Sequence, residues 1–151
     1  MATSKEVKRF ADVNIGDDLS PFTIDETQET IDAAVVRLDE DGTTQPSKNI
    51  HNDPEFAKKG IFSTTVNGGV ITMSYIAQML EQDFPRQSFF GAGSMLFKAI
   101  EPFRPGDTVT FTGSVTGKRQ EEGNNFVDCK IIGTNQKGNL IGVAESTLSL
   151  D

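Results

Sequence analysis

The segment from Gly68 to Asp83 restricts the possible folds of this chain more than any other part of its sequence. Its spacing of apolar residues predicts a helix that begins near Gly68 or Gly69 and ends before Pro85. The apolar positions cover much more than one narrow stripe: Val70, Ile71, Met73, Ile76, Ala77, Met79 and Leu80. Such a helix is mostly buried, so other parts of the chain have to cover it.

The second half of the chain has the patterns of β-strands. Thr108 to Lys118 alternates apolar with β-branched or small polar residues, and Phe126 to Ile132 and Leu140 to Leu150 are expected to form two further strands. Asn135 to Asn139 is a hairpin turn between the last two. Helices followed by an antiparallel meander belong to the α+β class. We expect a twisted antiparallel sheet wrapped around the central helix, which is the hot-dog arrangement.

Two shorter helices are expected before the central one. Ile31 and the apolar residues after it have helical spacing, which predicts a helix from Thr23 to Leu38, capped by Asp25 or by Thr23. Asp53 is expected to cap a short helix with Pro54 in its first position. Phe10 to Val13 is expected to lead into the first strand.

Composition and charge narrow the class of protein. The length of 151 residues predicts a single domain over residues 1–151, and a formal net charge of -8 argues against a nucleic-acid or anionic-membrane partner. The N-terminus lacks the apolar core of a signal peptide, and no apolar stretch is long enough to span a membrane. Cys129 is the only cysteine, so no intrachain disulfide can form, and we expect a cytoplasmic protein. No metal-ligand spacing or dinucleotide motif is present, so no metal or redox cofactor is expected.

The only histidine, His51, lies shortly before the central helix and its Gly68-Gly69 pair. Histidine titrates near neutral pH, and the first amides of a helix have no partner within it. A titratable ring close to such amides suits the binding and polarisation of a carbonyl group. The alternative interpretation is an ordinary loop histidine with a satisfied hydrogen bond. Asp53 is interpreted as a structural helix cap.

The segments around His51 resemble the hydratase motif of the MaoC-like, (R)-specific enoyl-CoA hydratases. The resemblance rests on Asn49 to Ala57, on its spacing to Val66 to Gly69, and on Phe97 to Val109, which is similar to the strand-turn-strand signature of that family. It covers roughly Phe10 to the C-terminus. It implies the hot-dog fold and a hydratase or dehydratase acting on acyl thioesters. Coenzyme A or a carrier protein would then be part of the substrate, and no separate cofactor is implied.

The resemblance also implies roles for individual residues. His51 matches the family histidine, which acts as the acid and base on the reacting water. Gly69 matches the glycine at the helix start, whose N–H polarises the thioester carbonyl. Gly68, Asn67 and Asn49 are the further candidates for substrate binding.

Two positions depart from the family pattern. The family aspartate lies five residues before the histidine, where this chain has Pro46. Asp41 is the candidate replacement, because the residues leading up to it match those before the family aspartate and an insertion would follow. The second departure is Gly68, which stands where the family often has histidine.

The missing aspartate leaves other functions open. The chain would alternatively be a non-catalytic acyl-thioester binder, the partner subunit of a heteromeric hydratase or, as a weaker possibility, a thioesterase. An open hot-dog sheet also exposes strand edges, so a homodimer or larger assembly is expected. Phe84, Phe89 and Phe90 are interpreted as core or subunit-contact residues, with an acyl tunnel as the alternative.

Overall fold

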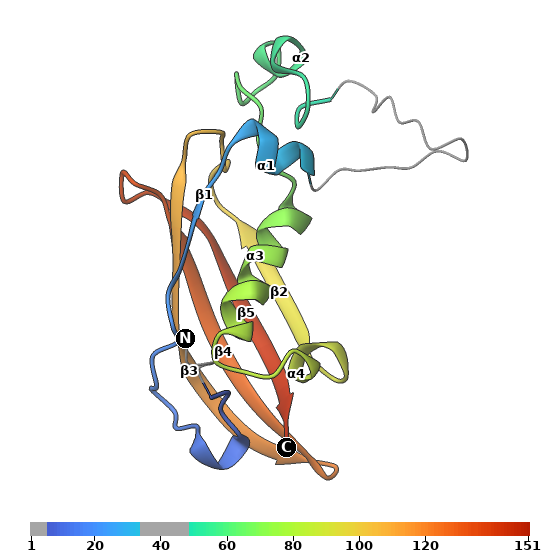
Figure 1. Cartoon of the computed structure of the whole chain (residues 1–151), viewed down its shortest axis with the longest axis vertical. Coiled ribbons are helices and arrows are strands. Elements are labelled where there is room, and N and C mark those ends of the chain that lie inside the picture. Colours follow the sequence, from blue (N-terminus) through green and yellow to red (C-terminus); the bar gives the residue numbers. More distant parts are fainter. Residues whose placement is uncertain (1–5, 34–48) are drawn as a thin grey trace, which may run out of the picture.

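The computed structural model describes residues 6–33 and 49–151, and these residues form a five-stranded antiparallel sheet and several helices. The strands are β1 (Phe22–Asp25), β2 (Ser94–Ala99), β3 (Thr108–Glu121), β4 (Asn124–Thr134) and β5 (Leu140–Leu150). The helices are the 3₁₀ helix η1 (Phe10–Asp12) and the α-helices α1 (Gln28–Ala33), α2 (Pro54–Lys58), α3 (Gly69–Glu81) and α4 (Gln87–Phe90). The strand order is β1-β3-β4-β5-β2, and Figure 1 shows the sheet curving around α3. The expected α+β hot-dog fold is confirmed.

Helix α3 begins where the glycine pair predicts. Gly68 has an extended backbone and is the N-cap, and its carbonyl oxygen accepts hydrogen bonds from the N–H groups of Ile71 (2.9 Å) and Thr72 (3.3 Å). The buried residues of the helix are Ile71, Thr72, Tyr75, Ile76, Met79 and Leu80. They pack against the inner face of the sheet, so most of the hydrophobic core lies between α3 and the strands.

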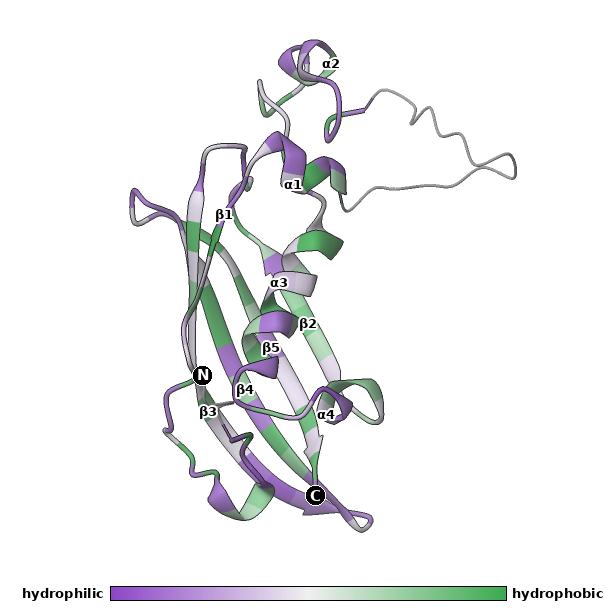
Figure 2. Cartoon of the chain, in the orientation of Figure 1, coloured by the Kyte–Doolittle hydropathy of each residue, from purple (hydrophilic) through white to green (hydrophobic). Residues whose placement is uncertain are grey.

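The strands alternate between buried and exposed residues, and Figure 2 shows the matching alternation of hydrophobic and hydrophilic positions. The inner face accepts a large ring where the paired residue is glycine. Gly133 pairs with Phe111 in the ladder between β3 and β4, and a Cβ atom on Gly133 would lie 2.7 Å from the ring of Phe111, so this glycine makes room for the ring. Cys129 is buried on the sheet, and burial raises the pKa of its thiol to about 12. The thiol therefore stays protonated at neutral pH.

The expected start of the first helix is wrong. Thr23 and Asp25 belong to β1, an edge strand whose ladder with β3 pairs Thr23 with Thr110. The backbone hydrogen bonds of this ladder prevail over the helical spacing that begins at Ile31. The helix is capped instead by Thr27, whose Oγ1 accepts the N–H of Thr30 at 3.1 Å. The predicted end of the helix lies outside the described residues.

The expected lead-in from Phe10 to Val13 is also different, because residues Phe10–Asp12 form η1. The predicted bounds of the last three strands agree better with the structure. The bounds of β5 are those expected, β3 is longer by a few residues at its C-terminal end, and β4 is longer at both ends. No helix of residues 6–33 and 49–151 is long and apolar enough to cross a membrane.

Candidate functional site

The loop before α2 fixes the position of His51. Its backbone N–H donates to Asn49 Oδ1 at 2.8 Å, and its ring Nδ1 lies 2.8 Å from the carbonyl oxygen of Val66. A carbonyl oxygen only accepts hydrogen bonds, so Nδ1 carries the proton in this pair. The neutral ring therefore keeps its lone pair on Nε2, which is the form needed in a general base.

A cavity of about 290 Å³ lies at the start of α3 and brings His51 together with the beginning of that helix. It is lined by Ile50, His51, Phe62, Val66, Asn67, Gly69, Thr72, Phe97, Ala99, Ile100, Glu101, Pro102, Phe103 and Ile141. Gly69 is the first helical residue, so its N–H has no acceptor within the helix. The positive end of the helix dipole lies at the same point. We call this space the His51 cavity.

Asn67 lines the His51 cavity, but both ends of its side chain already have protein partners. Its Nδ2 donates to Glu26 Oε2 at 3.0 Å, and its Oδ1 accepts from the hydroxyl of Thr72 at 3.0 Å. Its backbone N–H donates to the carbonyl of Phe103 at 2.9 Å. These bonds fix the residue that precedes the glycine pair, so Asn67 holds the helix start in place.

Not every predicted binding residue reaches the cavity. Gly68 caps α3 and Asn49 supports the backbone of His51, and neither is among the lining residues. Asp53 accepts the N–H of Phe56 at 2.9 Å, which confirms its interpretation as the cap of α2. Asp41 lies outside the described residues, so its role stays a prediction.

Glu26 is a residue that the sequence interpretation missed. Its side chain is 1% exposed, and it accepts hydrogen bonds from the hydroxyls of Thr30 and Tyr75 and from the amide of Asn67. A buried carboxylate is stabilised when polar groups around it donate hydrogen bonds. Its partners come from α1, α3 and the loop before α3, so one side chain ties three segments together. No motif marked this glutamate, since it directly follows a short edge strand.

Gln28 connects α1 to the loop that carries His51. Its Nε2 donates to the backbone carbonyl of His51 at 2.7 Å, and its Oε1 accepts from the hydroxyl of Thr65 at 2.5 Å. Figure 1 shows α1 and α2 at the end of the sheet where α3 begins. Glu26 and Gln28, two residues apart, therefore hold the His51 loop and the segment before α3, both of which line the His51 cavity.

Tyr75 provides a test of the buried network. Burial, with the adjacent Glu26 carboxylate as the next cause, raises the pKa of its phenol to about 12. The unfolded chain ionises near pH 10, so the stability contributed by the neutral phenol is present below pH 10 and is lost as pH rises toward 12. Tyr75 is the only tyrosine and the chain has no tryptophan, so ultraviolet titration follows this group alone.

We expect ionisation of Tyr75 to be delayed well above pH 10 in the native protein and to occur near pH 10 in concentrated urea. The free energy of unfolding should fall between pH 10 and 12 more steeply for the wild type than for Tyr75→Phe. Equal titration midpoints in buffer and in urea would contradict the buried contact with Glu26.

Comparisons with known proteins agree with this architecture. A family model described as "MaoC like domain" matches residues 42–136. No curated protein sequence matches this chain.

Several solved structures share the fold. A MaoC-like dehydratase from Rhodospirillum rubrum is 19% identical with a TM-score of 0.77, and the match covers 95% of this chain and 96% of that chain. An (R)-hydratase from A. caviae involved in PHA biosynthesis is 21% identical with a TM-score of 0.72, over 92% and 98% of the two chains. A truncated HadBC (3R-hydroxyacyl-ACP dehydratase) complex from Mycobacterium tuberculosis contains a chain that is 18% identical with a TM-score of 0.66, over 89% and 96%. At these identities the structural similarity establishes the fold.

Proposed function

Because this chain belongs to the family of MaoC-like domains, we propose that it hydrates 2-enoyl thioesters, or dehydrates the corresponding 3-hydroxyacyl thioesters, in the His51 cavity. One observation carries the proposal: the cavity is lined both by a histidine held in the tautomer of a general base and by the first amide of α3. The substrate is a thioester of coenzyme A or of a carrier protein.

The proposed reaction uses these two groups on different atoms of the substrate. The N–H of Gly69 binds the thioester carbonyl oxygen, where negative charge develops when a nucleophile adds to the conjugated double bond. His51 Nε2 takes a proton from water as its oxygen bonds to C3. The protonated His51 then donates this proton to C2 of the resulting enolate, which completes the addition of water and returns the ring to its neutral form. Asp41 is the proposed partner that orients the water.

The test is an absorbance assay on purified protein with a panel of 2-enoyl-CoA thioesters, together with a thiol assay on the same samples. A hydratase removes the absorbance of the conjugated thioester and releases no free thiol. Release of thiol would instead indicate a thioesterase. Tight binding of acyl-CoA with no turnover of short, long, branched or aromatic substrates would contradict the proposal and favour a binding or partner subunit.

We also propose that the protein forms a homodimer or a larger assembly in the cytoplasm. The support is the pair of strand edges that the described sheet exposes, at β1 and at β2. Leu96 on the edge strand β2 is 71% exposed, so an apolar side chain lies at one of these edges. Sedimentation of the purified protein would measure the assembly directly.

A further inference from the structure

The buried carboxylate of Glu26 is bonded to the segment that carries both backbone groups of the proposed reaction. These groups are the carbonyl of Val66, which holds the ring of His51, and the N–H of Gly69 at the start of α3. We propose that Glu26 is a positioning residue, which fixes this segment through the side chain of Asn67. Glu26 does not itself line the His51 cavity. The inference rests on the proposed function and adds a residue that acts on the site from outside it.

The start of α3 has no side chain of its own to hold it in place. Gly68 is the N-cap and makes no side-chain hydrogen bond, and Gly69 is the first helical residue. Glycine restricts its own backbone less than any other residue, so two in succession leave their direction to be set by their neighbours. The nearest side chain before this pair is that of Asn67, which has partners at both ends.

The amide of Asn67 is oriented by two partners from different parts of the chain. Its Nδ2 donates to Oε2 of Glu26 at 3.0 Å, and its Oδ1 accepts from the hydroxyl of Thr72 at 3.0 Å. An ionised carboxylate offers only acceptors, so the NH₂ end of the amide has to face Glu26. A charged acceptor also makes a stronger bond than a neutral one. Glu26 therefore sets the orientation of this amide and holds it close to the end of β1.

Glu26 is itself a fixed anchor. Its backbone N–H donates to the carbonyl of Asp107 at 2.8 Å, and its carbonyl accepts the N–H of Gly106 at 2.8 Å. Its Oε1 accepts from the hydroxyl of Tyr75 at 3.0 Å and from that of Thr30. The side chain is buried, so solvent does not compete for these bonds. The carboxylate is therefore held from both its backbone and its side chain.

Displacement of the segment after Asn67 would alter both backbone groups. The carbonyl of Val66 lies 2.8 Å from Nδ1 of His51, and without this bond the neutral ring also populates the tautomer with its proton on Nε2. That tautomer has no lone pair on Nε2 with which to take a proton from water. The N–H of Gly69 would move away from the oxygen on which charge develops. A misplacement of about 1 Å can lower a rate about a hundredfold.

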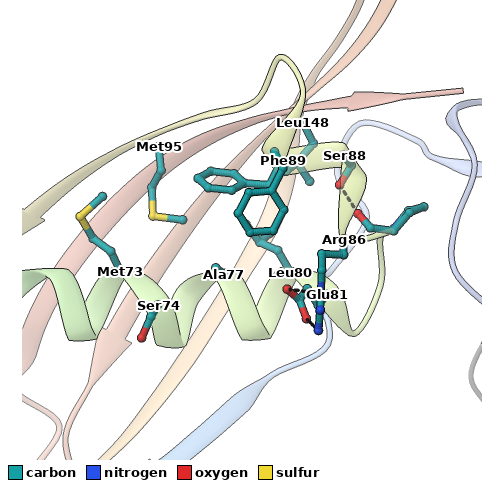
Figure 3. Close-up of a pocket in the computed structure, with 12 residues that line it drawn as sticks. Met73, Ser74, Ala77, Leu80, Glu81, Arg86, Ser88, Phe89, Met95 and Leu148 are labelled. Carbon is teal, nitrogen blue, oxygen red and sulfur yellow. Dashed lines mark hydrogen bonds and ion pairs between the residues drawn. The ribbon is translucent and has the colours of Figure 1, made fainter. Parts of the chain in front are cut away.

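The C-terminal half of α3 differs from its start. A second cavity of about 250 Å³ lies there, and Figure 3 shows mostly apolar side chains facing it. The charged side chains at this cavity, Glu81 and Arg86, pair with each other at 3.3 Å and are close in sequence. The bonds of the Glu26 carboxylate instead reach 41 and 49 residues along the chain. This buried charge therefore contacts α3 and the residue before it at the end of the helix that the proposed reaction uses.

A contribution to stability alone is the competing role of Glu26, and the experiment has to separate the two. Asn67→Asp places a second carboxylate beside Glu26, and the two repel at about pH 9, well above the ordinary pKa of a carboxyl group. Adding Glu26→Gln removes the repulsion, because the amide introduced at position 26 donates to the carboxylate introduced at position 67. Asn67→Asp with Glu29→Gln is the matched control, since it has the same net charge and Glu29 is exposed on α1.

The first measurement is NMR of the imidazole nitrogens at about pH 9, where a histidine ring is neutral. His51 is the only histidine, so its signals need no assignment. We expect the wild type to have its proton on Nδ1 and Asn67→Asp to populate both tautomers. Addition of Glu26→Gln should restore the wild-type tautomer, whereas addition of Glu29→Gln should not.

The second measurement is kcat for the hydration of a 2-enoyl-CoA, with urea denaturation of the same samples. Asn67→Asp is expected to lower kcat about tenfold to a hundredfold. Addition of Glu26→Gln should recover most of this loss, and addition of Glu29→Gln should recover none. The two double variants carry the same new carboxylate at position 67, so its charge near the start of α3 does not affect their comparison.

Equal tautomer populations and equal kcat in the two double variants would overturn the inference. Recovery of stability by Glu26→Gln without recovery of the tautomer or of kcat would do the same and leave Glu26 a structural role only. Absence of hydration in every protein, with the tautomers in the expected order, would overturn the hydratase and leave the role of Glu26 in holding His51.

A second variant keeps the inference testable if Asn67→Asp does not fold. Asn67→Ala removes the amide and leaves Glu26 its bonds from Tyr75 and Thr30. It should populate both tautomers of His51. A proton found on Nδ1 alone in this variant would show that the side chain of Asn67 does not position the ring, and would overturn the inference.

Discussion

Replacement of His51 by alanine is expected to lower kcat for the hydration of 2-enoyl thioesters by about 10²–10⁴-fold, the usual contribution of a positioned general base. The ring is held by the bond from Nδ1 to the carbonyl of Val66, which keeps the lone pair on Nε2. The variant loses both the proton acceptor and that bond. The substitution leaves the proposed thioester contact at Gly69 in place, so KM should change much less than kcat.

The stability of the variant has to be measured beside its activity. Loss of the single hydrogen bond to Val66 is expected to lower the free energy of unfolding by about 1 kcal/mol. Lys58→Ala is a suitable control, because Lys58 lies on the neighbouring helix α2, is exposed and does not line the His51 cavity. A folded His51→Ala protein with activity within tenfold of the wild type would show that His51 is not the general base.

The sequence predicted those parts of the fold that strong local signals define. Gly68 and Gly69 marked the start of α3, and Asp53 with Pro54 marked the start of α2, because caps and helix breakers act within one turn. The apolar breadth of α3 also indicated that a sheet covers it. The short helix α4 was not predicted, since its four residues leave no measurable periodicity.

The start of the first helix was mispredicted for a different reason. The spacing after Ile31 is helical, but the preceding residues form β1, which gains its ladder bonds from β3 more than eighty residues away. A local pattern carries no information about a partner so distant in the chain. Tertiary pairing therefore decided the conformation of Thr23 to Asp25.

In the candidate site, too, the residues marked by a local motif were predicted, and a residue whose partners are distant in the chain was missed. His51 and Gly69 were predicted to lie close together because a short segment joins them, and the structure places both on one cavity. Glu26 was missed because its partners Asn67 and Tyr75 lie 41 and 49 residues away, beyond any motif. A buried carboxylate cannot be told from an exposed one by residue type alone.

The hydrogen bonds around Glu26 give the second prediction, which is a large loss of stability. Replacement of Glu26 by alanine is expected to lower the free energy of unfolding by about 3–5 kcal/mol. The substitution removes a buried acceptor and leaves the hydroxyl of Tyr75 and the amide of Asn67 without it. Urea denaturation measures the change. Glu29→Ala is the matched control, because Glu29 is exposed on α1, and its effect should stay within about 0.5 kcal/mol.

A double-mutant cycle with Tyr75→Phe shows whether the loss arises in this contact. The two side chains share a hydrogen bond of 3.0 Å in the core. Once the phenol hydroxyl is absent, removal of the carboxylate leaves one fewer donor unsatisfied. The double variant should therefore be more stable than the sum of the two single effects predicts, by about 1–3 kcal/mol. Strict additivity would mean that Glu26 stabilises the fold through its other partners, the hydroxyl of Thr30 and the amide of Asn67, and not through Tyr75.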